Sequence, residues 1–310
     1  MTKNSAVGFA AISLCLIAAS LLYIPSNNKT QTNTIDIRQN TVLLFNTTKD
    51  LLTHFESINY NWPIEDKASL PKTIIRSIPA DAKNIRNSNE RKALFIRVML
   101  PVILAEQYRI RSERQMLELL LTKQNGQLTN LNDASIKNNK TIKDKLDKLF
   151  KEYKIKSTLT FSEKSRDLLN RFDELPLTLI LAQAAIESGW GTSRFTRVGN
   201  SLFGEWTYQK GAGILPQNRE AGKSHQIKAF SSLQGSIASY IKNINRNNAY
   251  KELRTLRTEM RLKQQTLDSR KLADGLHRYS QKGQDYVVSL KKILNSKEFR
   301  HLESLKLDGK

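Results

Sequence analysis

The pattern of apolar and polar positions divides the chain into an apolar segment near its start and a series of amphipathic segments after it. Residues 6–24 are 19 consecutive uncharged and largely apolar positions, long enough to span a bilayer. Residues 25–40 are polar, and no clear small-x-small cleavage site follows the apolar segment. We therefore expect a transmembrane anchor at 6–24, a short cytoplasmic end at 1–5 and a flexible tether at 25–40. A cleaved signal peptide is the alternative, and both interpretations place the rest of the chain outside the cytoplasm.

Residues 41–156 show helical periodicity in three places and are expected to form a helical N-terminal region. Apolar residues recur at helical spacing over 47–58, over a long run from 88 to 121 and over 142–153. Pro101 lies inside the long run, so we expect it to kink or divide that helix. Pro63, Pro71 and Pro79 predict short or irregular pieces over 59–87, and the polar residues 125–139 predict a turn region.

Residues 160–298 combine helical patterns with one glycine-rich stretch. Thr160 or Ser162 can cap a helix that runs to Phe172, and a strongly apolar helix follows Pro176. The stretch 205–230 has no long helical period and predicts two or three short strands in a small hairpin. Helical patterns resume at about 233–246, 248–264, 269–279 and 284–296, and 299–310 is expected to be a tail. The predicted fold class is α+β, mostly α.

Glu187 is the strongest candidate for a chemical role. It lies seven residues after Ile180 and three after Ala184, so it continues the apolar stripe of its helix. Because burial disfavours an ionised carboxylate, the pKa of Glu187 should rise, as a general acid at neutral pH requires. Gly189 can end the helix with a positive φ. Taken alone, a single Glu in a helix is more often a core residue that finds a partner.

The residues around Glu187 also carry a longer motif. AxxESGWGTSRF, followed closely by GNSLFGEW, resembles the signature of the peptidoglycan glucosaminidases of glycoside hydrolase family 73, in particular their Bax-type periplasmic branch. Further matches follow in the same order at 228–232, 236–240, 247–250, 272–280 and Tyr286, so the resemblance covers about residues 160–295. It implies a lysozyme-like module at 160–298 that hydrolyses the β-1,4 bond between N-acetylglucosamine and N-acetylmuramic acid in peptidoglycan.

Cleavage of a glycosidic bond usually needs a second group beside the acid. The resemblance implies a second carboxylate in the hairpin, for which Glu220 is the candidate and Glu205 the alternative. It also implies an active-site tyrosine, which is matched by Tyr279. When the sugar carries a 2-acetamido group, its own carbonyl can act as the nucleophile, and we expect this substrate-assisted route with Glu187 as the acid.

Further residues near this motif are candidates for substrate binding: Trp190, Asn200, Phe203 and Trp206. Aromatic rings can form walls on which sugars stack, although aromatic residues near a helix end are more often core residues. Trp190 in particular can instead pack under the helix of Glu187. Asn200 is expected to tie its loop to the cleft.

Charge and residue content limit which binding partners and cofactors are expected. The net charge of +21 predicts attraction to polyanions. For an exported protein, peptidoglycan, with its peptide carboxylates, and anionic lipid head groups are nearer than nucleic acid, and no nucleic-acid-binding module is recognised. Cys15, the single cysteine, lies in the apolar segment, and the 4 histidines show no metal-ligand spacing, so no cofactor and no metal are expected.

The predicted function is therefore that of a periplasmic endo-β-N-acetylglucosaminidase, anchored in the inner membrane, acting on peptidoglycan glycan strands and monomeric. A lytic transglycosylase or muramidase is the nearest alternative, because these enzymes also use one Glu on a lysozyme-like fold. A wall-binding scaffold without activity is an alternative from a different class. A membrane-tethered nucleic-acid binder is another, although it depends on charge alone.

Overall fold

The computed structural model describes residues 41–65, 69–121, 140–216 and 225–307. The predicted anchor at 6–24, the tether at 25–40 and the turn region at 125–139 lie outside the described residues. None of the helices within the described ranges combines the length and hydrophobicity that a membrane-spanning helix needs.

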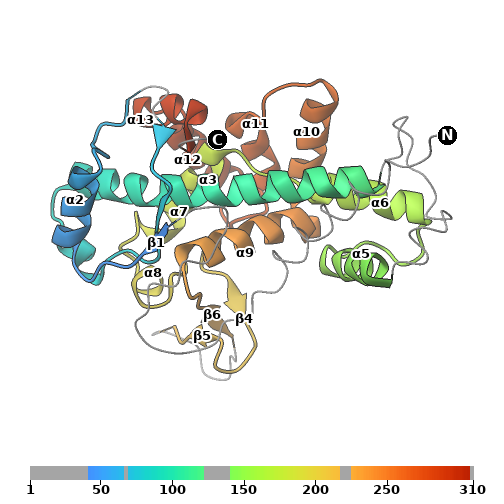
Figure 1. Ribbon diagram of the computed structural model, residues 1–310, viewed down its shortest axis with the longest axis horizontal. Helices are drawn as coiled ribbons and strands as arrows, with labels where there is room; N and C mark the ends of the chain where they lie inside the picture. The colour runs from blue at the N-terminus through green and yellow to red at the C-terminus, as the bar shows by residue number, and fades with distance from the viewer. Residues whose placement is uncertain (1–40, 66–68, 122–139, 217–224, 308–310) are drawn as a thin grey trace, which may run out of the picture.

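The N-terminal part is built around one long helix, α3 (Ser88–Leu121), which extends across the described structure in Figure 1. The elements before it are β1 (Thr41–Leu43), α2 (Thr48–Ser57), β2 (Ser69–Leu70), β3 (Thr73–Ile75) and η1 (Ala80–Asn84). After it comes α5 (Lys140–Glu152). The periodicity predicted all three α-helices, and the short pieces over 59–87 agree with the prolines there.

Pro101 lies inside α3 and does not divide it. Proline has no N–H, so the carbonyl of Arg97, four residues earlier, loses its helical hydrogen-bond donor. The hydroxyl of Tyr60 instead donates a hydrogen bond to this carbonyl at 3.1 Å. A donor from outside the helix therefore satisfies the group that proline leaves unpaired, and the helix continues.

The second half follows the predicted order of elements. Thr160 caps α6 (Phe161–Arg171) in a capping box with Glu163, and α7 (Leu177–Ser188) and α8 (Arg194–Gly199) follow. The later helices are α9 (Leu233–Arg246), η2 (Asn248–Tyr250), α10 (Lys251–Leu262), α11 (Ser269–Ala273), η3 (Asp274–Leu276), α12 (Gln284–Leu294), α13 (Lys297–Arg300) and η4 (His301–Ser304). The predicted helix at 269–279 is shorter than expected, since α11 gives way to the 3-10 turn η3.

The glycine-rich stretch forms the predicted small sheet, which lies on one side of the helices beyond α9 in Figure 1. Its strands β4 (Trp206–Thr207), β5 (Gly213–Ile214) and β6 (Gln226–Lys228) are antiparallel, and β6 lies between the other two. The sequence pattern does not predict two parallel pairs, β1 with β3 and β2 with β7 (Lys306–Leu307). Strands this short contain too few residues to show alternation.

Helix α7 lies at the centre of the described structure. It packs against α3, α11, α12 and η4, and every residue from Leu177 to Ala185 is buried. The buried apolar side chains form one cluster that extends from α2 and α3 through α7 to α12 and α13. The expectation of a tail from residue 299 is wrong for residues 299–307, which belong to this core, because Phe299 and Leu302 are buried and β7 pairs with β2. The N-terminal helices therefore share one core with the second half.

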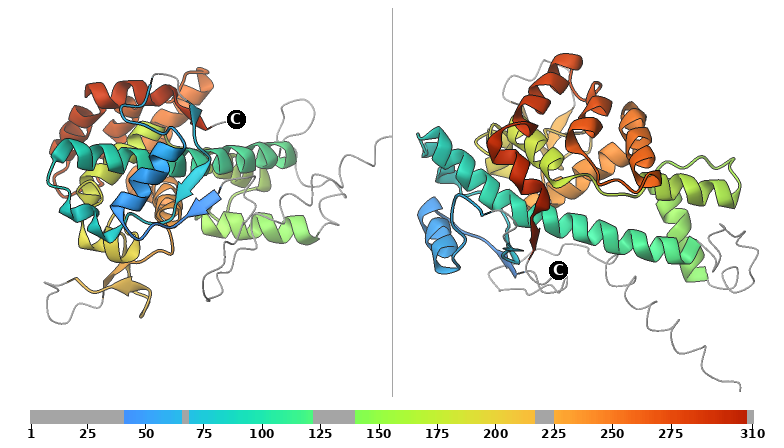
Figure 2. Two further views of the ribbon diagram at one scale, coloured as in Figure 1. Left: turned by 60° about the vertical axis from the view of Figure 1, so that its left-hand side comes forward. Right: turned by 90° about the horizontal axis from the view of Figure 1, so that it is seen from above.

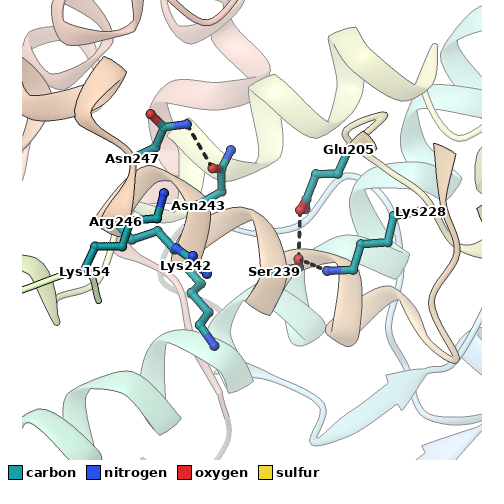
Figure 3. Close-up of a pocket in the computed structure, with 8 residues that line it drawn as sticks. All are labelled: Lys154, Glu205, Lys228, Ser239, Lys242, Asn243, Arg246 and Asn247. Carbon is teal, nitrogen blue, oxygen red and sulfur yellow. Dashed lines mark hydrogen bonds between the residues drawn. The ribbon is translucent and has the colours of Figure 1, made fainter. Parts of the chain in front are cut away.

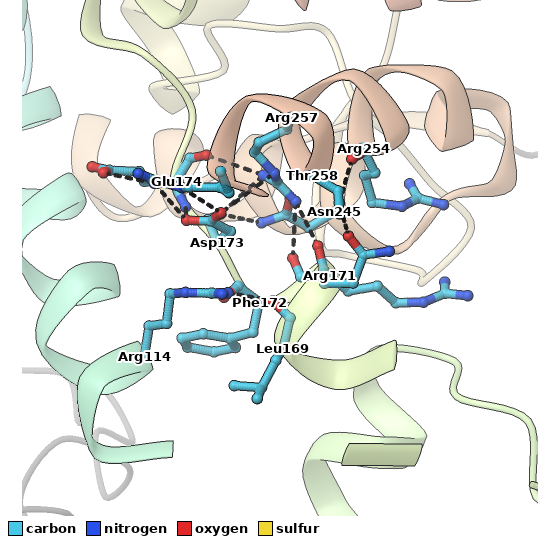
Figure 4. Close-up of polar contacts among 12 residues, drawn as sticks. Arg114, Leu169, Arg171, Phe172, Asp173, Glu174, Asn245, Arg254, Arg257 and Thr258 are labelled. Carbon is cyan, nitrogen blue, oxygen red and sulfur yellow. Dashed lines mark hydrogen bonds and ion pairs between the residues drawn. The ribbon is translucent and has the colours of Figure 1, made fainter. Parts of the chain in front are cut away.

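A buried polar network fixes the loop that leads into α7 (Figure 4). Arg257 of α10, which is 1% exposed, donates hydrogen bonds to the backbone carbonyls of Glu174 and Asn170, each at 3.0 Å. Arg261 pairs with the carboxylate of Asp173 at 2.9 Å. Burial alone would raise the pKa of Asp173, but the charge of Arg257 and the hydrogen bond from Arg261 hold that pKa below its usual value. The network therefore sets where α7 begins relative to α10.

Candidate active site

Glu187 lies in the last turn of α7, as its place in the apolar stripe predicts. The helix ends at Gly189, whose φ of 57° is left-handed and suits a residue without a side chain. The buried hydroxyl of Ser188 donates to the Ala184 carbonyl at 2.6 Å and accepts from the Gly191 N–H at 2.8 Å. The turn beside Glu187 is thus held by its neighbouring serine.

A chain of hydrogen bonds from three helices ends at the carboxylate of Glu187. The hydroxyl of Tyr240 on α9 donates to Gln183 Oε1, and Gln183 Nε2 donates to the hydroxyl of Tyr286 on α12 at 2.9 Å. That hydroxyl in turn donates to Glu187. Gln183 precedes Glu187 by four residues and so shares its face of α7. The carboxylate is therefore oriented by groups whose own directions are defined.

The surroundings of Glu187 favour its protonated form. Burial raises the pKa of the carboxyl, while the hydrogen bond from Tyr286 and the charge of Lys282 offset part of the rise. The side chain is nevertheless partly exposed, so a ligand can reach it. An accessible carboxyl that keeps its proton to a higher pH can act as a general acid.

Several tyrosines lie near enough to Glu187 for its charge to raise their pKa values, in addition to the larger effect of burial: Tyr240, Tyr250, Tyr279 and Tyr286. The ring of Tyr279 stacks on that of Tyr286 with centroids 5.3 Å apart, and it lies 6.0 Å from the ring of Tyr250. Within the described ranges, the hydroxyl of Tyr279 forms no hydrogen bond. The predicted active-site tyrosine thus lies beside the predicted acid with its hydroxyl available.

Glu205, the alternative second carboxylate, is the residue immediately before β4 in the chain and is partly buried (Figure 3). The hydroxyl of Ser239 on α9 donates to its Oε2 at 2.8 Å, and Lys228 Nζ donates to the same hydroxyl at 2.8 Å. Burial raises the pKa of Glu205, and these two residues offset part of the rise. Its Oε1 is buried with no hydrogen-bond partner in the described part of the chain. Glu220, the first candidate, lies outside the described residues.

Glu205 lines a pocket of about 270 Å³ whose walls are polar and largely cationic. The lining residues, drawn in Figure 3, are Lys154, Glu205, Lys228, Ser239, Lys242, Asn243, Arg246 and Asn247. Asn243 hydrogen-bonds the hydroxyl of Tyr250, whose pKa is raised by burial and then by the charges of both Glu205 and Glu187. Tyr250 is therefore near both the pocket and Glu187.

The predicted substrate-binding residues have different surroundings. Asn200 takes a left-handed conformation at the end of α8, and its amide donates to the Phe230 carbonyl at 3.2 Å. It ties α8 to the loop after β6. Trp206 is 63% exposed and stacks on His225 with centroids 4.5 Å apart. Its exposed ring, next to Glu205 in the chain, can contact a sugar.

Trp190 and Phe203 have the contacts of packing residues. The ring of Trp190 lies 5.8 Å from that of Phe95 and 6.4 Å from that of Phe299. Phe203 is buried and stacks on Tyr240 with centroids 4.0 Å apart. A sugar-binding role for these two aromatic residues has no support in such contacts.

The sequence pattern alone does not mark Gln183 or Tyr286 as site residues. One signal was available for Gln183, since it is a polar residue in an apolar helix, four positions before Glu187. Tyr286 is one of the positions that match the family motif, but it stands 99 residues after Glu187, and no local pattern shows that the two meet. Their contact depends on how α12 packs on α7.

The chemistry that these side chains themselves offer is proton transfer by carboxyl groups and hydrogen bonding by tyrosine hydroxyls. Among the residues that the structure describes, no group of three or more His, Cys, Asp or Glu side chains is placed to hold a metal ion.

Comparison with known proteins identifies the class of this site. Residues 163–298 match the glucosaminidase family model, described as mannosyl-glycoprotein endo-beta-N-acetylglucosaminidase. Protein bax of Escherichia coli (strain K12) is 31% identical over 212 residues, which cover 68% of this chain and 70% of that protein. No solved structure gives a significant match. The chain therefore belongs to the glucosaminidase family, as a Bax-type member, and is a glycoside hydrolase of the endo-β-N-acetylglucosaminidase class.

Proposed function

We propose that this protein hydrolyses the β-1,4 bond between N-acetylglucosamine and N-acetylmuramic acid in peptidoglycan, with Glu187 as the general acid. The observation that carries the proposal is the state of this carboxyl at the end of α7. It is buried enough to have a raised pKa, exposed enough to be reached, and oriented by the hydroxyl of Tyr286. A proton held in this way can be given to the oxygen of the leaving sugar.

The second catalytic role is assigned to the substrate's own 2-acetamido group. Its carbonyl oxygen attacks the anomeric carbon as the glycosidic oxygen takes the proton of Glu187, and water then opens the cyclic intermediate. Such a route needs a protein group that orients the acetamide. Tyr279 suits this role, because its ring is packed beside Glu187 and its hydroxyl forms no hydrogen bond within the described ranges.

A base-activated water is the other route, and it requires a second carboxylate. Glu205 is the described candidate, at a pocket whose Asn243 bonds Tyr250. Burial raises the pKa of Glu205, which would make its carboxylate a stronger base. Glu220 lies outside the described residues and stays the candidate that the family resemblance implies.

A lysozyme-like arrangement of the module at 160–298 is part of the same proposal. It is supported by a bundle of helices with a small antiparallel sheet beside it and by an acid at a helix end. The related alternative, a lytic transglycosylase or muramidase, would use the same acid on the other linkage. A scaffold without activity would bind peptidoglycan and release no products.

The products of purified peptidoglycan separate these functions by mass analysis. A reducing N-acetylglucosamine end supports the glucosaminidase, and a 1,6-anhydro-muramic end supports the transglycosylase. Substitution Glu187→Gln keeps the shape and removes the acidic proton, so we expect hydrolysis to fall by ~10²–10⁴-fold with the fold retained. Activity of this variant near that of the natural protein would contradict the assignment of Glu187.

We also propose that the protein works in the periplasm while anchored in the inner membrane by residues 6–24, as a monomer. The support is the uncharged apolar run itself, together with a substrate class that lies outside the cytoplasm.

A further inference from the structure

The cationic pocket beside Glu205 carries an inference about which part of the substrate the protein recognises. We propose that it is a subsite for a carboxylate of the stem peptide carried by muramic acid, and that the N-terminal region supplies one wall of it. This inference rests on the proposed function, because it names the group that lies beside the bond to be cut.

The charges around the pocket are not all neutralised by the protein. Lys242 forms an ion pair with Glu152 at the end of α5, and Lys228 is linked to Glu205 through Ser239. In the described ranges, neither of the other two cations, Lys154 and Arg246, has a carboxylate at ion-pair distance. Figure 3 shows both on the same side of the pocket as Lys242, away from Glu205. The pocket therefore offers two uncompensated cations to an anionic ligand.

Lys154 comes from outside the segment that matches the family model. It follows α5 in the turn that closes the helix, where Ile155 N–H bonds the Phe150 carbonyl at 2.8 Å. Its φ is 54°, a left-handed conformation that favours glycine or asparagine over a residue with a long side chain. The side chain of Lys154 lines the pocket together with that of Arg246 of α9.

The position of the pocket selects the anion. Asn243 of the pocket bonds Tyr250, and Tyr250 packs against Tyr279 beside Glu187, so these residues connect the pocket to the reaction site. A glycan strand that lies across Glu187 has neutral sugar rings, and its anionic groups are the carboxylates of the stem peptides. The side-chain amides of Asn243 and Asn247 can bond the peptide groups that lead to such a carboxylate. Lys154 and Arg246 would then bind a part of the substrate that Glu187 does not contact.

The test uses the full-length protein carrying Glu187→Gln, so that ligands are bound and not cut. Its affinity is measured by calorimetry at low salt for a stem-bearing oligosaccharide, the same oligosaccharide without stems and with its lactyl carboxyls capped as amides, and one whose stem carboxyls are amidated. We expect the stem-bearing ligand to bind about ten-fold more tightly than the other two. Added salt should reduce this preference, since part of each ion pair is exposed.

Added substitutions then locate the preference. Lys154→Gly removes the cation and places in the left-handed turn the residue that suits it, so the turn is not put at risk. We expect this change and Arg246→Gln each to reduce the preference about three- to ten-fold. Lys151→Ala is the matched control, because it removes the same charge from an exposed residue in the last turn of α5, three positions before Lys154, that does not line the pocket. It should leave the preference unchanged.

Equal affinity for stem-bearing and stem-free ligands would overturn the subsite, as would a preference that survives both Lys154→Gly and Arg246→Gln. Tight binding of the amidated ligand would show that a carboxylate is not what the pocket recognises. Failure of the proposed function gives a different result. In that case the natural protein would not release a reducing N-acetylglucosamine end from peptidoglycan, while the binding preference could still be present.

Discussion

Tyr286 on α12 donates a hydrogen bond to Glu187 on α7, and its hydroxyl also accepts one from Gln183 at 2.9 Å. Both roles of this hydroxyl are therefore used, and it cannot turn away from the acid without breaking one of them. The orientation of the carboxylate thus depends on the packing of two helices that are far apart in the chain.

Substitution Tyr286→Phe removes both hydrogen bonds. Because the bond to Glu187 favours the charged carboxylate, its loss should raise the pKa of Glu187 further and move the basic limb of the pH–rate profile to higher pH. We expect kcat to fall by about ten-fold as the acid loses its orientation, and the free energy of unfolding to fall by about 1–3 kcal/mol. Tyr208→Phe changes an exposed tyrosine and is the control. An unmoved pH profile would contradict the role given to Tyr286.

The raised pKa of Glu187 also predicts how stability depends on pH. A carboxyl whose pKa is higher in the folded state contributes stability below its unfolded pKa, and this contribution is lost as pH rises through the folded pKa. Glu187→Gln should therefore raise the melting temperature at about pH 7, and the difference should shrink towards about pH 4.

Glu163 provides a control of opposite sign for this measurement. Its pKa is lowered by the backbone and side-chain hydrogen bonds of Thr160 in the capping box. Its contribution is present above the unfolded pKa and is lost as pH falls through the folded pKa, so Glu163→Gln should lower the melting temperature at about pH 7. Melting curves that shift in the same direction for both variants would contradict this account of Glu187.

Tyr279 and the hairpin carboxylates should differ in how much activity depends on them. If the acetamido group is the nucleophile, Tyr279→Phe should lose more activity than Glu220→Gln or Glu205→Gln, with the fold retained in all three. The configuration of the first product, followed by NMR, tests the same point, because substrate assistance gives retention and a base-activated water gives inversion. An inverted product together with an inactive Glu220→Gln or Glu205→Gln variant would make that carboxylate the general base.

Gly275 is expected to be essential to the fold near Tyr279. A β-carbon at this position would lie 2.3 Å from the backbone nitrogen of Leu253 and 2.4 Å from its Cα, so α10 and η3 could not stay in contact. We expect Gly275→Ala to cost about 1–3 kcal/mol of unfolding free energy. Gly235→Ala is the comparison. Gly235 lies in α9, and a β-carbon there would have no neighbouring atom closer than 3.6 Å. Chemical denaturation should show Gly235→Ala to be as stable as the natural protein or more so.

Residues 6–24 are expected to keep the protein in the membrane fraction through a high-salt wash. Burial of apolar surface is not screened by salt, whereas attraction between the basic protein and anionic lipids is. Release by salt, or a mature N-terminus near residue 25, would show instead that the segment is not an anchor.

The helices of the second half were predictable because local signals agree with the tertiary structure. The capping box at Thr160 begins α6, and Gly189 ends α7, in each case through contacts within a few residues. Glu187 itself could be identified for the same reason, since its burial follows from the periodicity of one helix.

Only the tertiary structure decided what surrounds that acid. Tyr286 and Gln183 meet because α12 packs on α7. Tyr60 donates a hydrogen bond to the carbonyl that Pro101 leaves unpaired. Lys154 lines the pocket of Glu205 although it comes from a distant part of the chain. These contacts join residues that are far apart in the sequence. Periodicity and capping are local properties and do not predict such contacts. The sequence determined which residue can hold a proton, and the packing of α12, α9 and α5 determined which groups orient it and which charges stand beside it.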